Sequence, residues 1–197
     1  MKQNFNNNKK ARLPPGQHLT KRFPVLQKGR VAHVDRENYN LIITGNVSNP
    51  KKFSLEDLNQ LEDQEVIIDI HCVTSWSKFD TTWKGISFKK IFKIVDPKPT
   101  AKYVEFECAD DGFTTTVPIQ ELNKENCLLA TKYEGQSLDD KHGGPIRALI
   151  PHLYFYKSAK WVKQINFLIE DRLGYWERGG YSNKADPWKE QRYRYHD

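Results

Sequence analysis

The chain has 197 residues, of which 38% are hydrophobic, and it contains five Trp, nine Tyr and ten Phe. This composition is typical of a folded globular protein and excludes a disordered chain. The net charge of +6 would suit an anionic ligand or nucleic acid, but the sequence has no dense Lys/Arg stripe and no nucleic-acid-binding signature.

The first residues differ in composition from the rest. Residues 1–16 are rich in Asn, Lys and Gln and end in Pro-Pro-Gly, which predicts a flexible N-terminal arm before a single domain at 17–197. No apolar stretch approaches the roughly 18 residues that cross a bilayer. The start also lacks the apolar segment of a secretory signal. We therefore expect a cytoplasmic protein that does not bind a membrane.

Signals for strands and helices alternate irregularly through the first half of the domain. Strands are predicted at 39–44 and 65–71. A short helix is predicted between them, because Ser54 and Asp57 have the spacing of an N-terminal capping box. Residues 73–85 show no secondary-structure period, so we expect a long loop there.

The second half contains one further helix and mostly strands. Residues 86–95 place their apolar side chains on one helical face, which predicts the helix. Strands are predicted at 104–108, 113–117, 126–133 and 161–169. Many short strands, few helices and long loops indicate an α+β domain with a mixed, mostly antiparallel sheet.

Cys72 is the main candidate functional residue. It follows the predicted strand at 65–71 and precedes a loop rich in aromatic residues. Its thiolate could be a soft metal ligand or a nucleophile, and a buried core cysteine is the equally weighted structural alternative. Cys108 and Cys127 lie in apolar runs and are expected to be core residues. No Cys-x-x-Cys pair is present, which gives no support to a zinc ribbon or an iron–sulfur cluster.

Three other stretches carry polar groups beside glycine or aromatic residues. The run His142-Gly-Gly-Pro-Ile-Arg147 lets the backbone approach a ligand, and its His and Arg suit an anion. Ser158-Ala-Lys160 offers a hydroxyl and an ammonium group to a phosphate. The aromatic run after Gly174 could form a pocket wall, a lid or a packed strap. Each signal alone is weak, because a solvated turn or ordinary packing explains it as well.

Taken together, these stretches resemble the sulfite oxidase-like family of molybdopterin-dependent oxidoreductases, in particular its small bacterial single-domain members. The matching marks are His71-Cys-Val-Thr-Ser-Trp-Ser-Lys78, His142-Gly-Gly-Pro-Ile-Arg147, Ser158-Ala-Lys160 and Trp176-Glu-Arg-Gly-Gly-Tyr181. They occur in the family's order and span nearly the whole chain.

The resemblance implies a sulfite oxidase-type fold, a pyranopterin whose dithiolene holds molybdenum, and a role for each marked residue. Cys72 would be the one protein ligand to the metal. His142, Arg147, Ser158, Lys160 and, from an earlier segment, Phe23 would bind the pterin and its phosphate. Tyr181, Trp76 and Lys78 would form the catalytic pocket.

The resemblance further implies two-electron oxygen-atom transfer with a small oxo-donor or oxo-acceptor and an external electron-transfer partner. Sulfite-oxidising members carry an arginine shortly after the cysteine, where this chain has Lys78 as its only cation. This difference weakens sulfite as a substrate. Two alternatives stay open: a cysteine hydrolase that uses Cys72 with His71 or His142, and a non-catalytic protein that binds an anion or nucleic acid.

Overall fold

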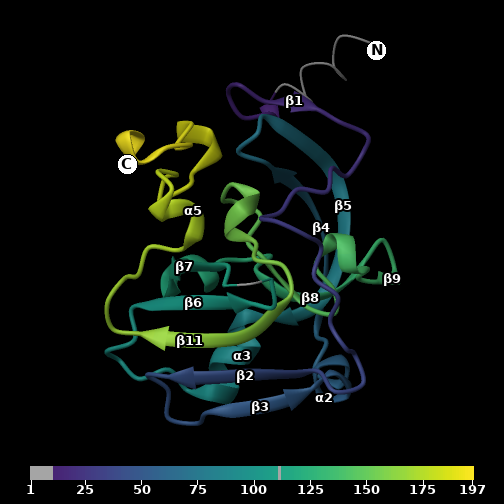
Figure 1. Cartoon of the computed structure of the whole chain (residues 1–197), viewed down its shortest axis with the longest axis vertical. Coiled ribbons are helices and arrows are strands. Elements are labelled where there is room, and N and C mark those ends of the chain that lie inside the picture. Colours follow the sequence, from purple (N-terminus) through teal and green to yellow (C-terminus); the bar gives the residue numbers. More distant parts are fainter. Residues whose placement is uncertain (1–10, 111) are drawn as a thin grey trace.

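The computed structural model describes residues 11–110 and 112–197, and it has the expected α+β architecture with two sheets rather than one (Figure 1). Residues 1–10, most of the predicted arm, lie outside the described residues. The rest of that arm contacts the domain: Arg12 donates to both carboxylate oxygens of Asp69. No helix in the described chain is long and apolar enough to cross a membrane.

The first sheet has five strands in the order β3-β2-β11-β6-β7. Their bounds are Asn40–Gly45 (β2), Lys51–Ser54 (β3), Tyr103–Cys108 (β6), Thr114–Pro118 (β7) and Val162–Leu168 (β11). Among the described strands of this sheet, β11 and β2 form the one parallel pair. The expectation of a mostly antiparallel sheet is therefore confirmed here, and the predicted strands at 104–108 and 113–117 do form an antiparallel pair.

The second sheet contains the long strand β5, which pairs with β1, β4 and β8. The strands are His18–Leu19 (β1), Gln64–His71 (β4), Trp76–Ser87 (β5), Leu128–Tyr133 (β8), Gln136–Ser137 (β9) and Arg147–Leu149 (β10). In Figure 1 this sheet stands beside the first, with β5 running most of its height.

The prediction of a loop at 73–85 is wrong, because most of this stretch is β5. The inward-facing residues Thr81, Trp83 and Gly85 do alternate with partly buried ones. Two of the three are polar or lack a side chain, so the alternation is invisible to a search for apolar periodicity. Thr81 can be buried because its hydroxyl donates to the carbonyl of Ile68 on β4, at 2.7 Å.

Helices are few and short. They are Leu55–Gln60 (α2), Phe88–Val95 (α3), Ile119–Leu122 (α4) and Tyr175–Arg178 (α5), with 3-10 turns Asp140–His142 (η1), Phe155–Lys157 (η2), Pro187–Lys189 (η3) and Arg194–His196 (η4). The predicted capping box is present at α2, where Ser54 and Asp57 bond reciprocally. The predicted apolar face of α3 is buried, with Phe88, Ile91 and Val95 at most 1% exposed.

Two groups of buried apolar side chains fill the molecule. The larger packs the first sheet against α3, with Leu41, Val104 and Ile165 fully buried. The smaller lies on the second sheet and contains Cys72 and Trp83, with Phe23 packed against it. The smaller group therefore brings the candidate cysteine and the irregular N-terminal segment to the same place.

Candidate functional site

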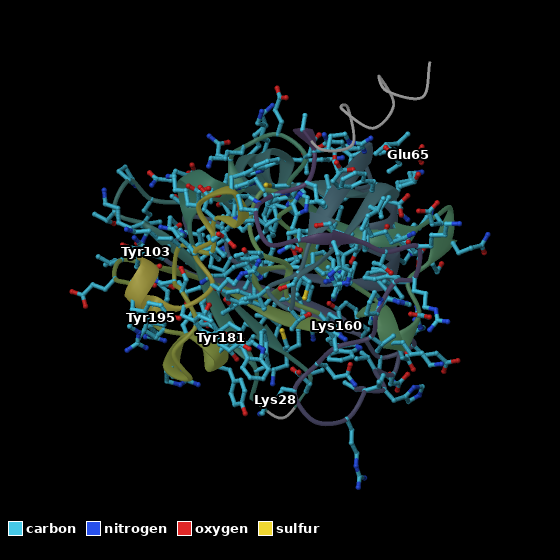
Figure 2. The ribbon with its side chains drawn as sticks, turned by 90° about the horizontal axis from the view of Figure 1, so that it is seen from above. Lys28, Glu65, Tyr103, Lys160, Tyr181 and Tyr195 are labelled. Carbon is cyan, nitrogen blue, oxygen red and sulfur yellow. The ribbon has the colours of Figure 1, made fainter. Side chains whose placement is uncertain are left out.

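A cavity of about 260 Å³ brings together all the residues that the resemblance assigns to the site, with the exception of Lys78, and it does not include His71. The marked residues that line it are Phe23, Cys72, Trp76, His142, Arg147, Ser158, Lys160 and Tyr181. They come from segments up to about 160 positions apart in the sequence. Figure 2 shows Lys28, Lys160 and Tyr181, which all line the cavity, in one part of the molecule and Glu65 far from them.

Cys72 sits in the tight connection between β4 and β5. Its N–H donates to the carbonyl of Trp76 at 2.8 Å, and its carbonyl accepts from the N–H of Ser75 at 3.0 Å. The side chain of Gln17 donates to the same carbonyl at 3.0 Å. The loop backbone is thus fixed on both sides. Cys72 lines the cavity, and its sulfur has the hydroxyl of Thr74, 3.2 Å away, as its hydrogen-bond partner.

Burial raises the pKa of the Cys72 thiol, because the anion loses its hydration. The thiol therefore stays protonated at neutral pH unless a cation or metal ion stabilises the sulfur anion. The hydroxyl of Thr74 and the charge of Arg192 act in the opposite direction and favour the thiolate. A thiol of this kind is a poor free nucleophile and a suitable ligand for a metal that displaces its proton.

Neither candidate histidine is hydrogen-bonded to Cys72. The ring of His71 bonds instead to the hydroxyl of Ser77 at 2.8 Å, and burial lowers its pKa to about 4. His142 bonds through Nδ1 to Asp139 at 2.8 Å. A cysteine hydrolase needs a base within hydrogen-bonding reach of its sulfur, so this geometry does not favour that alternative.

Arg147 is a buried cation that has no carboxylate partner among the described residues. The residue is only 2% exposed, and its side chain donates to the carbonyls of His142 and Ser158, both at 2.8 Å. Its guanidinium also lies 4.3 Å from the ring centre of Phe155. Burial lowers its pKa to about 9. A buried charge without a counter-ion is costly, so the site is suited to an anionic group.

Lys160 adds a second cation to the same wall. Its Nζ donates to the carbonyl of Lys141 at 3.1 Å and to the side chain of Gln27 at 3.3 Å. Burial, and then the nearby charge of Arg147, lower its pKa to about 7. An anion in the cavity would restore its charge, because opposite charges favour the ionised form.

Two ring nitrogens at the cavity are buried and lack a hydrogen-bond partner in the described structure, Nε2 of His142 and Nε1 of Trp76. Buried polar atoms normally have partners. The ring of His142 is stacked on Phe23 at 4.2 Å between centroids. The side chains of His142 and Trp76 therefore line the cavity while each keeps an unpaired polar nitrogen buried behind its surface.

An aromatic wall of the cavity comes from α5 and the residues that follow it. The ring centroids of Trp176 and Tyr181 are 5.4 Å apart, and those of Tyr156 and Tyr181 are 5.5 Å apart. Burial raises the pKa of Tyr181, and a charge on Cys72 would raise it further. The Tyr181 hydroxyl therefore stays protonated and can act as a hydrogen-bond donor.

Lys78 does not line the cavity, which departs from its predicted place in the pocket. Its Nζ donates to the carbonyl of Lys21 at 3.2 Å. The reason is the parallel pairing of β1 with β5, which brings the following residues of the N-terminal segment alongside Lys78. The motif spacing could not reveal this contact, since it joins residues 57 positions apart.

Sequence reasoning also missed residues that fix the Cys72 loop from a distance. Arg192 donates to the carbonyl of Val73 at 2.5 Å, and Gln17 holds the carbonyl of Cys72. Phe113, from the turn before β7, lines the cavity as well. None of them stands in a motif, and no signal in the sequence joins them to Cys72.

Comparisons with known proteins show the family to which the chain belongs. The model of the family described as oxidoreductase molybdopterin binding domain matches residues 28–176. An uncharacterized oxidoreductase, YuiH, of Bacillus subtilis (strain 168) is 41% identical over 93% of this chain and 92% of its own length.

More distant relatives include longer proteins, of which the chain spans about half the length. The protein-methionine-sulfoxide reductase catalytic subunit MsrP of Pseudomonas syringae pv. tomato is 26% identical, with 72% of this chain and 47% of that protein covered. Sulfite oxidase of Arabidopsis thaliana is 26% identical, with 78% and 48% covered. The crystal structure of the sulfane dehydrogenase SoxCD from Paracoccus pantotrophus shares the fold, with a TM-score of 0.64 at 19% identity over 71% of this chain and 40% of that one.

Proposed function

Because the chain belongs to the oxidoreductase molybdopterin binding domain family, we propose that it catalyses a two-electron oxygen-atom transfer on a small substrate at a molybdenum ion bound by Cys72. The resemblance to sulfite oxidase-like enzymes is confirmed. The chain is thus an oxidoreductase, and its cofactor is molybdenum with molybdopterin. The hydrolase and the non-catalytic binder are set aside.

The observation that carries the proposal is that Cys72 shares one cavity with a buried, uncompensated guanidinium. Arg147 and Lys160 supply positive charge, and His142 lines the same cavity. A pterin phosphate needs these groups. We assign the phosphate to Arg147, Lys160, Ser158 and His142, and assign Phe23 to the pterin, as the resemblance implies.

The molybdenum–pterin group, when bound, supplies the two-electron redox chemistry. The chain's own residues prepare the site for it. Cys72 gives up the proton of its thiol when its sulfur binds the metal, and Gln17 keeps the loop backbone in place. The aromatic wall of Trp176 and Tyr181 excludes water, and the Tyr181 hydroxyl orients the oxygen of the substrate.

The walls favour a neutral oxo compound, such as a sulfoxide, over an anion such as sulfite. Val73, Thr74, Trp76, Trp176 and Tyr181 line the cavity without contributing a charge. Arg147 and Lys160 are assigned to the phosphate. Of the other two lysines that line the cavity, Lys28 and Lys141, the first has its ammonium group 4.5 Å from the ring centre of Tyr175. A relative is named as a methionine-sulfoxide reductase subunit, which supports the same substrate class.

Electrons pass to or from an external partner, as the resemblance implies. We place the enzyme in the cytoplasm, as the sequence predicts. Fractionation of cells into cytoplasm and membrane, with immunodetection of the chain, tests this location. Recovery in the membrane fraction or outside the cytoplasm would contradict it.

The decisive experiment compares the purified wild type with Cys72→Ser. We expect molybdenum by elemental analysis and pterin fluorescence after oxidation in the wild type, together with viologen-driven reduction of methionine sulfoxide. Cys72→Ser should lose the reaction and keep the melting temperature. Cys127→Ser is the matched control, because the Cys127 thiol is also buried and the hydroxyl can keep its bond to Glu121. Wild-type turnover in Cys72→Ser would refute the ligand role.

A further inference from the structure

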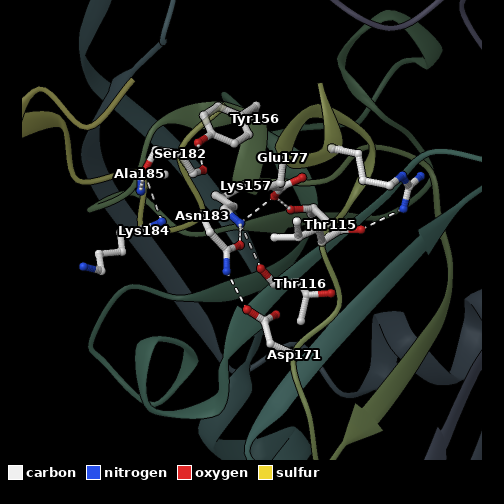
Figure 3. A network of polar contacts seen from close by, with 12 residues as sticks. Thr115, Thr116, Tyr156, Lys157, Asp171, Glu177, Ser182, Asn183, Lys184 and Ala185 are labelled. Atoms are coloured by element: carbon white, nitrogen blue, oxygen red, sulfur yellow. Dashed lines mark hydrogen bonds and ion pairs between the residues drawn. The ribbon is translucent and has the colours of Figure 1, made fainter. Parts of the chain in front are cut away.

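A buried ion pair joins Lys157 and Glu177, whose neighbours in the chain line the cavity (Figure 3). Both side chains are 0% exposed, and Nζ lies 2.5 Å from Oε1. Lys157 also donates to the carbonyl of Thr116 at 2.9 Å and to the side chain of Asn183 at 3.1 Å. The hydroxyl of Thr115 donates to Glu177 at 2.6 Å. The pair is therefore fixed by neighbours on β7 and in the C-terminal segment.

The two members of the pair lie on two different segments whose residues line the cavity. Lys157 lies between Tyr156 and Ser158, which both line it. Glu177 follows Trp176 on α5, and the chain then reaches Tyr181. The pair is thus a direct link between the wall assigned to the cofactor and the aromatic wall assigned to the substrate. A second link is the bond from the hydroxyl of Tyr156 to the carbonyl of Ser182.

The backbone before α5 lies close to both β7 and the carboxylate of Glu177. A Cβ at Gly174 would meet the carbonyl of Thr114 at 2.3 Å and Oε2 of Glu177 at 2.6 Å. The chain therefore enters α5 in close contact with β7, and the carboxylate fills the space that the glycine leaves. The position of Trp176 depends on this packing, because it is the residue immediately before Glu177.

Stability alone does not account for this pair. Desolvation of two charges offsets most of their attraction, and replacing a buried pair with apolar residues of similar size is often neutral or stabilising. A hydrogen-bonded pair does, however, fix distance and orientation more narrowly than apolar contact. We propose that Lys157 and Glu177 are positioning residues, which set the separation of the two cavity walls and thereby the affinity for substrate.

The first test of this proposal measures substrate affinity and therefore rests on the proposed function. The experiment uses the full chain with its cofactor, methionine sulfoxide as the probe and a reduced viologen as the electron donor. The double variant Lys157→Met with Glu177→Leu removes the link and keeps an apolar core. We expect molybdenum content and melting temperature close to wild type, KM raised by about tenfold and kcat within about twofold. An unchanged KM would overturn the positioning role.

A matched control separates positioning from general stability. Glu62 accepts from the hydroxyl of Thr131 at 2.6 Å and pairs with Lys132 at 3.1 Å, away from the cavity. The single variant Glu177→Gln removes one charge of the buried pair. Glu62→Gln makes the same change at a similar carboxylate away from the cavity. Both variants should lower the melting temperature, and only Glu177→Gln should raise KM. An equal rise in KM for Glu62→Gln would contradict a specific role.

A second measurement does not need activity. Hydrogen–deuterium exchange of the full chain reports the opening of residues 175–181. We expect exchange there at least about tenfold faster in the double variant, with no change in β2 or α3. Unchanged exchange would overturn the proposal even if the enzyme is active. If the wild type holds no molybdenum, the proposed function fails while this measurement still decides whether the pair orders the wall.

Discussion

At the scale of single residues, the site is defined by groups that lack a partner. Arg147 has only carbonyl and ring contacts, and Nε2 of His142 has no hydrogen-bond partner among the described residues. Most buried polar groups in folded proteins have a hydrogen-bond partner, so groups without one at a cavity mark a place for a polar guest. Both residues line the same cavity as Cys72. Residues of this one cavity therefore account for the assignment of an anionic cofactor.

Arg147→Met should lower the molybdenum and pterin content by about tenfold or more, since a charge-assisted bond contributes roughly 1.5–3 kcal/mol. It should also lower the melting temperature, because the carbonyls of His142 and Ser158 lose their donor. Elemental analysis and calorimetry measure the two effects. Arg12→Met is the control, because Arg12 pairs with Asp69 away from the cavity and its loss should leave the cofactor content unchanged.

The lowered pKa of Lys160 predicts that the folding stability of the cofactor-free protein depends on pH. Its pKa falls from 10.5 to about 7 on folding, so between these values the unfolded chain binds the extra proton and folding stability rises with pH. The melting temperature of the wild type should therefore rise relative to that of Lys160→Met from about pH 7 to about pH 10. The rise should vanish when cofactor is bound. A difference that does not change with pH would contradict the assignment.

At the scale of elements, the sequence predicted the helices and strands that have a regular apolar face. The prediction failed for an element whose buried face is not apolar throughout. The helix at α3 and the strands β2, β4 and β11 carry regular apolar spacing, and all were expected. β5 was missed because its buried positions include Thr81 and Gly85, whose burial depends on partners in β4 and β8. The division into two sheets likewise depends on long-range pairing, such as β11 with β2, which no local pattern reveals.

The close approach of β5 to β8 can be tested at Gly85. A Cβ there would meet the carbonyl of Leu129 at 2.1 Å and Cα of Ala130 at 2.8 Å. Gly85→Ala should therefore reduce the free energy of unfolding by about 1–3 kcal/mol through overpacking, measured by urea denaturation. Thr82→Ala, on the other face of the same strand, should cost less. Equal stability of Gly85→Ala and wild type would contradict the strand pairing.

At the scale of the whole molecule, the two ends of the described chain meet at the Cys72 loop. Arg192 donates to the carbonyl of Val73 and to those of Pro15 and Gly16. The candidate ligand is thus held by residues that precede and follow the rest of the domain. The sequence motifs predicted most of the residues that line the cavity. They could not predict the contacts of Arg192 with the Cys72 loop and the N-terminal segment, because these contacts form only in the folded chain.

Arg192→Leu should loosen both ends together. Loss of its bonds should reduce the free energy of unfolding by about 2 kcal/mol, or roughly 4–8 °C in melting temperature for a chain of this length. Calorimetry measures the shift, and hydrogen exchange should increase near residues 15–17 and 72–75. Arg172→Leu is the control, because that side chain is 67% exposed. An unchanged melting temperature for Arg192→Leu would show that the link is dispensable.

The bond between molybdenum and the sulfur of Cys72 is the central claim, and it can be measured directly. X-ray absorption spectroscopy at the molybdenum edge counts the sulfur atoms around the metal in the purified wild type and in Cys72→Ser. We predict one sulfur ligand fewer in Cys72→Ser than in the wild type, with the dithiolene sulfurs present in both. The same number of sulfur ligands in the two proteins would contradict the assignment of Cys72 as the protein ligand.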